Sequence, residues 1–155
     1  LPADCLVVNV QGDEPLVPPP LLGDLVRTLR GDPAIELLTA AHPATDAAGF
    51  ASPHVVKVVL DAGGRALYFS RAGIPHPRGA PLAYLRHVGV YAFRRAALSR
   101  FVALAPGPLE SREGLEQLRA LEHGMTIHVL LTAYETMGID TPADLESVAR
   151  RLDTA

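Results

Sequence analysis

The feature that most constrains the fold is a short apolar run that ends abruptly at an acidic loop. Leu6–Val10 is mostly β-branched, which is typical of a strand buried on both faces. Gln11-Gly12-Asp13-Glu14-Pro15 follows, where glycine permits a tight turn and proline prevents further pairing. Ligands bind at the carboxyl ends of parallel strands, and Mg²⁺ prefers one or two carboxylates plus substrate phosphates. The loop therefore suggests a magnesium site at Asp13, and the alternative is a solvated turn.

A second acidic loop lies near the other end of the chain. Gly138-Ile139-Asp140-Thr141-Pro142 follows the apolar run Ile127–Leu131 and precedes a predicted helix. Thr141 and Asp144 have the spacing of a capping box, with proline at the first helical position. This places Asp140 beside the exposed N–H groups of a helix N-terminus, which favour anions. The alternative role of Asp140 is simply to help cap that helix.

The remaining chain alternates between helical and strand patterns. A Gly-Gly pair at 63–64 between two β-rich runs predicts a hairpin. Alternating helices and strands favour an α/β sandwich with this antiparallel hairpin inserted. We predict helices over 21–30, 94–104, 109–123 and 142–152, and strands over 35–41, 55–60, 66–70, 87–93 and 126–131. Residues 42–53 are consistent with a short helix or an irregular surface segment.

Length and composition exclude several classes of protein. A chain of 155 residues with 48% apolar and 20% charged residues fits one globular domain with a real core. A net charge of −3 gives no electrostatic basis for binding nucleic acid. No apolar stretch approaches the ~20 residues of a membrane span. Cys5 is the only cysteine, so no intramolecular disulfide or thiolate cluster forms, and we expect a cytoplasmic protein.

Both acidic loops and several stretches between them resemble one enzyme family. The sequence motifs are Val-Asn-Val-Gln-Gly-Asp-Glu-Pro (8–15), Val-Val-Lys-Val-Val-Leu-Asp (55–61), Ala-Leu-Tyr-Phe-Ser-Arg-Ala-Gly-Ile-Pro (66–75), Leu-Arg-His-Val-Gly-Val-Tyr (85–91), Leu-Glu-Gln-Leu-Arg (115–119) and Gly-Ile-Asp-Thr-Pro-Ala-Asp-Leu (138–145). They resemble the 3-deoxy-manno-octulosonate (Kdo) cytidylyltransferases, also called CMP-Kdo synthetases. The resemblance implies a Rossmann-like nucleotidyltransferase sandwich with a mostly parallel sheet, of which residues 1–155 form one incomplete, N-terminally truncated domain.

Several polar residues gain candidate roles from this resemblance. Arg71 and Arg78 alone would be surface charges, but guanidinium groups bind carboxylates bidentately and a sugar acid carries one. His87 and Tyr91 are four apart, so on a strand they share one face and could contact sugar hydroxyls or the carboxylate. By itself, a histidine beside a strand is more often structural.

The resemblance also implies a complete set of site residues. It assigns catalysis and Mg²⁺ binding to Asp13 and Asp140. It assigns substrate binding to Gln11, Arg71, Arg78, His87, Tyr91, Glu116 and Gln117. Without it, the Glu116-Gln117 pair would be read as an exposed polar face of the 109–123 helix.

The implied reaction is the attack of the Kdo 2-hydroxyl on the α-phosphate of CTP, which gives CMP-Kdo and pyrophosphate for lipopolysaccharide biosynthesis. The implied substrates are CTP and Kdo, the implied cofactor is Mg²⁺ and the implied assembly is a homodimer, with no nucleic-acid or membrane partner. Two alternatives remain: a cytidylyltransferase for a sialic-type acid, and a non-catalytic remnant that binds sugar or dimerises.

These residues contain no recognisable triphosphate loop. There is one lysine, Lys57, and neither a Gly-x-x-x-x-Gly-Lys loop nor a Gly-x-Gly-x-x-Gly turn. Binding a triphosphate without a Gly-rich basic loop is physically implausible. In the family this task falls to an N-terminal segment rich in Arg, Ser, Gly and Lys. We therefore expect these 155 residues alone to be inactive or nearly so.

Overall fold

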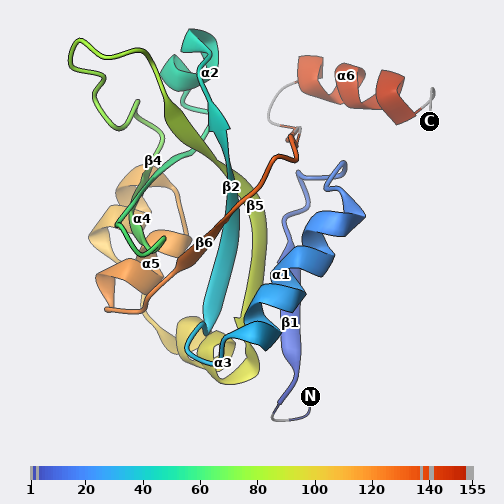
Figure 1. Ribbon diagram of the computed structural model, residues 1–155, viewed down its shortest axis with the longest axis vertical. Helices are drawn as coiled ribbons and strands as arrows, with labels where there is room; N and C mark the ends of the chain where they lie inside the picture. Colours follow the sequence, from blue (N-terminus) through green and yellow to red (C-terminus); the bar gives the residue numbers. More distant parts are fainter. Residues whose placement is uncertain (1, 3, 137, 140–141, 153–155) are drawn as a thin grey trace.

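The computed structural model describes residues 2, 4–136, 138–139 and 142–152, which form one six-stranded sheet with helices on both faces (Figure 1). The strands are β1 (Leu6–Val10), β2 (Leu37–Ala44), β3 (Lys57–Leu60), β4 (Ala66–Ser70), β5 (Tyr84–Arg94) and β6 (His128–Leu131). The helices are α1 (Pro19–Gly31), α2 (Ala47–Ala51), α3 (Arg95–Ala103), α4 (Pro108–Glu113), α5 (Gln117–Glu122) and α6 (Pro142–Leu152).

The long strand β5 is the centre of the sheet. The sheet order is β4-β3-β5-β2-β6, and β1 also pairs with β5. β2 pairs with one edge of β5 along nearly its whole length, from Leu37 opposite Phe93 to Ala44 opposite Tyr84. The other edge is therefore shared by β3 and β1, which pair with the beginning and the end of β5 respectively.

The expectation of a mostly parallel sheet is wrong for the described strands. Only β2 and β6 pair in parallel, and the other described pairings are antiparallel. Helix α1 does return the chain from β1 to a strand of the same direction, β2, as the alternating pattern predicts. However, β5 lies between these two strands and runs the opposite way, because a connection without a helix brings it back from the β3–β4 hairpin. The α/β class and the inserted antiparallel hairpin are confirmed.

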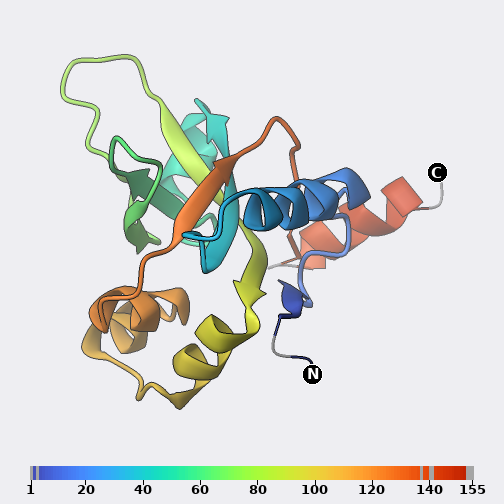
Figure 2. The same cartoon turned by 60° about the horizontal axis from the view of Figure 1, so that its bottom comes forward.

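The two faces of the sheet bury separate hydrophobic clusters, and side chains alternate between them along β5. Helix α1 covers one face, and α5 lies on the other side of the sheet (Figure 2). Val88, Val90 and Ala92 face α1, whose Leu21, Leu25 and Leu29 are completely buried. Tyr91 and Phe93 point to the opposite face and pack with residues of α5 and of the hairpin.

The predicted continuous helix over 109–123 is wrong, because the structure has two short helices there. α4 ends at Gly114, which adopts a left-handed conformation with φ of 62°. This conformation is cheap for glycine and strained for other residues, so the break occurs at this position. The chain turns through Leu115 and Glu116 before α5 begins at Gln117. Among the described residues, none of the helices has the length and apolar character needed to cross a bilayer.

Candidate active site

The candidate site lies where β1 and β3 meet end to end along one edge of β5. β1 stops with Val10 opposite Val90, and β3 starts with Lys57 opposite Arg86. Between these two pairs, β5 hydrogen-bonds to loop residues, with Gln11 N donating to Gly89 O at 3.0 Å. Because neither strand continues across this interval, a cavity of about 340 Å³ opens beside it. A volume of that size is ordinary for a small-molecule site.

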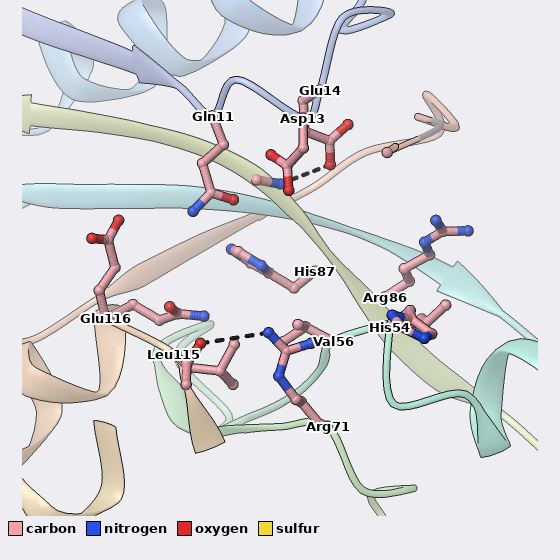
Figure 3. Close-up of a pocket in the computed structure, with 15 residues that line it drawn as sticks. Gln11, Asp13, Glu14, His54, Val56, Arg71, Arg86, His87, Leu115 and Glu116 are labelled. Carbon is pink, nitrogen blue, oxygen red and sulfur yellow. Dashed lines mark hydrogen bonds between the residues drawn. The ribbon is translucent and has the colours of Figure 1, made fainter. Parts of the chain in front are cut away.

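The cavity brings together residues from distant parts of the chain. Figure 3 shows Gln11 and Asp13 on one side, Arg71 on the opposite side and His87 between them. Of the residues predicted for the site, the cavity is lined by Gln11, Asp13, Arg71, His87, Glu116 and Gln117. Glu116 and Gln117 reach the cavity because α4 ends before them and the chain turns there before α5 begins.

The other predicted residues lie elsewhere. Tyr91 lines a smaller adjoining cavity of about 210 Å³, whose wall also includes Glu116 and Gln117. Its ring lies against His87, with centroids 5.5 Å apart, so the predicted common face of this pair is confirmed. Arg78 is exposed in the loop between β4 and β5 and does not line the cavity. Asp140 lies outside the described residues.

Gly89 allows the acidic loop to pack directly on β5. A Cβ at this position would lie 2.3 Å from Gln11 Oε1 and 3.1 Å from Glu14 Cγ. The backbone N–H of Gly89 donates to Glu14 Oε1 at 3.2 Å (Figure 3). The absence of a side chain at Gly89 thus places both Gln11 and Glu14 at the cavity.

His87 is buried and neutral. Burial lowers the pKa of His87 from 6.5 to about 3. Thr39 Oγ1 lies 2.9 Å from His87 Nε2 and donates its own hydrogen to Val90 O at 2.7 Å. The Thr39 oxygen must therefore accept from Nε2–H, which leaves Nδ1 as an acceptor. A neutral ring suits a sugar hydroxyl better than it suits a carboxylate.

Tyr91 carries a buried hydroxyl that has no hydrogen-bond partner within the described part of the chain. Burial raises the pKa of Tyr91 well above 10, and the nearby charge of Glu116 raises it further. The hydroxyl is therefore protonated and able to donate. An unpaired buried hydroxyl costs free energy, so a group that completes this bond would bind favourably.

The Arg71 guanidinium is held in place by backbone carbonyls. Nε donates to Glu113 O and Nη1 to Pro53 O, both at 2.8 Å. Nη2 reaches Gly114 O at 3.5 Å, the contact drawn as a dashed line from Arg71 in Figure 3. Glu113 also accepts from the Arg71 backbone N–H at 2.9 Å. Because a guanidinium has five N–H donors, these contacts leave one hydrogen on each Nη for a ligand.

Sequence reasoning missed several residues that line the cavity. Glu14, His54, Arg86 and Gly89 belong to its wall. Burial raises the pKa of Glu14, against hydrogen bonds from Gly89 and Thr136 that lower it. Glu14 and Gly89 lie inside motifs that were already recognised, but only the packing of the loop on β5 reveals their contact. Arg86 also lies in the recognised motif 85–91, but no role was assigned to it.

The acidic loop is also tied to the segment that leads into α6. Ile139 N donates to Asp13 O at 2.8 Å, and Gly138 lines the cavity. No group of three His, Cys, Asp or Glu side chains among the described residues converges in a way that could hold a metal. The Asp13 carboxylate is exposed at the cavity and offers the hard oxygen donor that Mg²⁺ prefers.

Comparisons with known proteins agree with this arrangement. A cytidylyltransferase family model matches residues 2–127. The 3-deoxy-manno-octulosonate cytidylyltransferase of Anaeromyxobacter sp. (strain Fw109-5) is 51% identical over 148 residues, covering 94% of this chain and 59% of that protein. The protein of the same name from Halorhodospira halophila (strain DSM 244 / SL1) is 49% identical over 162 residues, covering 97% of this chain and 63% of that protein.

A solved structure shows the same fold. It is described as CMP:2-keto-3-deoxy-manno-octonic acid synthetase complexed with CTP, and it matches with a TM-score of 0.87 and 42% identity. The match covers 96% of this chain and 62% of that one. The chain therefore spans less than two thirds of the length of each of these relatives.

Proposed function

Because this chain belongs to the cytidylyltransferase family, we propose that it carries the sugar-acid side of a site that transfers the cytidylyl group of CTP to Kdo. The relatives that resemble it over more than 90% of its length are named for this reaction. The products are CMP-Kdo and pyrophosphate, and the activated sugar serves lipopolysaccharide biosynthesis.

The observation that carries this proposal is the composition of the cavity between β1 and β3. The acidic loop with Asp13 lies on one side of the cavity, Arg71 lies on the other side, and the buried neutral His87 lies between them. Arg71 offers two free N–H groups to a carboxylate, while Gln11, His87 and Gln117 offer neutral partners for hydroxyls. A polyhydroxylated carboxylic acid matches both kinds of partner.

In the proposed mechanism this chain mainly positions the sugar. Arg71 binds the carboxylate and His87 Nδ1 accepts from a sugar hydroxyl, which points the 2-hydroxyl toward the acidic loop. The 2-hydroxyl oxygen bonds to the α-phosphorus, the bond to the β-phosphate oxygen breaks, pyrophosphate leaves and the hydroxyl proton is released. Phosphoryl transfer of this kind needs positioning and charge neutralisation more than a protein nucleophile.

We assign Mg²⁺ to Asp13 and Asp140. The exposed carboxylate of Asp13 and the hydrogen bond from Ile139, the residue before Asp140, support this assignment. When bound, the ion would neutralise developing charge on the phosphate oxygens. Arg78 and Tyr91 remain proposed sugar contacts, and a cytoplasmic homodimer is the proposed state of the enzyme.

The test is a pyrophosphate-release assay on the gene product that contains this chain. CTP and Mg²⁺ are supplied with Kdo, with a sialic-type acid or with no acceptor. Release that depends on Kdo supports the proposal. Release with the sialic-type acid alone would reassign the substrate, and binding of Kdo without release would favour a non-catalytic sugar-binding protein.

A further inference from the structure

The only lysine of the chain is completely buried beside the candidate site. Lys57 begins β3, and its side chain is 0% exposed. Its Nζ donates to three backbone carbonyls, those of Ser52 at 2.8 Å, Val55 at 2.6 Å and Arg71 at 2.6 Å. A lysine is almost never fully buried unless its charge is compensated, so this position needs an explanation.

The three contacts show that Lys57 is an ammonium ion. A neutral amine has two hydrogens and would direct its lone pair at one of the three carbonyl oxygens, whereas an ammonium provides three donors. Burial lowers the pKa of Lys57, and the nearby Glu113 carboxylate opposes that change. The carbonyl dipoles and this carboxylate stabilise a charge that burial disfavours.

The three residues whose carbonyls accept from Lys57 all line cavities of the candidate site region. Val55 and Arg71 line the cavity between β1 and β3. Ser52 and Val55 line an adjoining cavity, and Ser52 also caps the C-terminus of α2. A single ammonium therefore joins the segment after α2 to the residue that carries the guanidinium.

Arg71 is held from both sides of its backbone. Its carbonyl accepts from Lys57, and its N–H donates to Glu113. Its guanidinium donates to Pro53 O, which lies within the segment 52–55 that Lys57 also holds. If the ammonium were removed, two supports of the guanidinium, the Arg71 backbone and the 52–55 segment, would each lose a partner, and the contacts to Glu113 O and Gly114 O would remain.

We propose that Lys57 is a positioning residue of the sugar-acid site, which fixes the Arg71 guanidinium where it meets the substrate carboxylate. This inference rests on the proposed function. The alternative is a purely structural role, in which Lys57 only stabilises the hairpin. In that case loss of Lys57 would lower the free energy of unfolding without a selective effect on KM for the sugar acid.

The first test compares the kinetics of Lys57→Met with those of a matched control, both made in the gene product that contains this chain. Methionine keeps an unbranched apolar stem and removes the donors. The control is Arg65→Met, which removes a cation of the same hairpin whose side chain is 57% exposed. We expect Lys57→Met to raise KM for Kdo by about 10- to 100-fold, with KM for CTP and the control variant nearly unchanged.

A double-mutant cycle identifies the route of the effect. If Lys57 acts through Arg71, Lys57→Met should change KM for Kdo by less than about threefold once Arg71→Ala is present. Equal effects of Lys57→Met with and without Arg71 would overturn the proposal. So would equal increases in KM for both substrates.

A second test needs no variant, so it decides the matter even if Lys57→Met does not fold. Because Lys57 is the only lysine, ¹⁵N-lysine labelling of this chain gives one side-chain ammonium signal. We expect that signal to be protected from exchange and to shift when Kdo saturates the site. If calorimetry detects Kdo binding but the ammonium signal does not shift, the inference about Lys57 is overturned and the proposed function stands. If the protein neither binds nor converts Kdo, the proposed function is overturned as well.

Discussion

The backbone N–H of Ile139 donates a hydrogen bond of 2.8 Å to the carbonyl oxygen of Asp13. This bond joins the two acidic loops, which lie near opposite ends of the chain. It is independent of either carboxylate, so it holds the loops together whether or not a cation is present. Carboxylate variants in these loops should therefore alter chemistry more than folding.

Asp13→Asn should lower kcat on the order of 100-fold. A neutral amide holds a divalent cation less well than a carboxylate does, so less of the charge that develops on the phosphate would be neutralised. Asp140→Asn should act in the same way, and chelation of divalent cations should abolish turnover of the unmodified protein. The control is Asp24→Asn on α1, whose carboxylate pairs with Arg27. Pyrophosphate release measures the turnover of the three variants and of the chelated protein. Normal kcat for Asp13→Asn with Mg²⁺ would refute the metal assignment.

Gly89→Ala should weaken sugar binding with little loss of stability. Its Cβ would displace the flexible end of Gln11, from which it would lie 2.3 Å, without meeting backbone. We expect KM for Kdo to rise by about tenfold and the free energy of unfolding to change by less than about 1 kcal/mol. Gly12→Ala is the control, because nothing lies within 4 Å of a Cβ there. A larger loss of stability than of affinity would contradict this account.

His87 should make the protein sensitive to acid. The pKa of His87 is about 3 in the folded protein against 6.5 for an ordinary histidine, so the unfolded chain binds the proton first as the pH falls. Stability from the neutral ring is complete above pH 6.5 and declines below it, by about 2 kcal/mol at pH 5. Urea titrations at pH 7.5 and 5 should show a smaller decline for His87→Gln.

The control for that measurement is His76→Gln, since His76 is exposed in the loop before β5. It should keep the acid sensitivity of the unmodified protein. An identical decline for His87→Gln and the unmodified protein would show that the ring is not the source. The ¹⁵N shifts of His87 at pH 7 should also report the Nε2–H tautomer that the Thr39 contact requires.

Tyr91→Phe should separate stability from binding. The hydroxyl is buried without a partner in the described structure, so its removal should leave the free protein equally stable or more stable by up to about 1 kcal/mol. The same change should weaken Kdo binding if the sugar supplies the missing partner. Thermal unfolding with and without Kdo measures both effects, with Tyr134→Phe as an exposed control. A Tyr91→Phe protein that unfolds more easily and binds Kdo normally would contradict this role.

Local sequence patterns predicted most elements because their causes are local. The apolar run before the acidic loop, the Gly-Gly hairpin and the proline at the start of α6 each act within a few residues. The direction of β1 relative to β2 was also predictable, since a crossover helix determines it. The insertion of β5 between them was not, because it depends on partners 40 residues or more away.

The site residues divide in the same way. Motifs identified Gln11, Asp13 and His87, whose chemistry is evident from residue type. Lys57 attracted no role, because its three carbonyl acceptors come from a segment before it and a residue after the hairpin. The Gly114 break was not predicted, because the apolar ridge of Leu115, Leu118 and Leu121 suits the end of a long helix as well as a separate short one.

Strand β5 serves two purposes at once, since its side chains alternate between the face that lines the candidate site and the cluster beneath α1. An inherited change at His87 or Tyr91 therefore affects neighbours that hold the whole sheet together. Divergence in substrate choice among descendants of such a chain should accumulate in the connection 72–83, which leads from β4 to β5 and can vary without disturbing that strand.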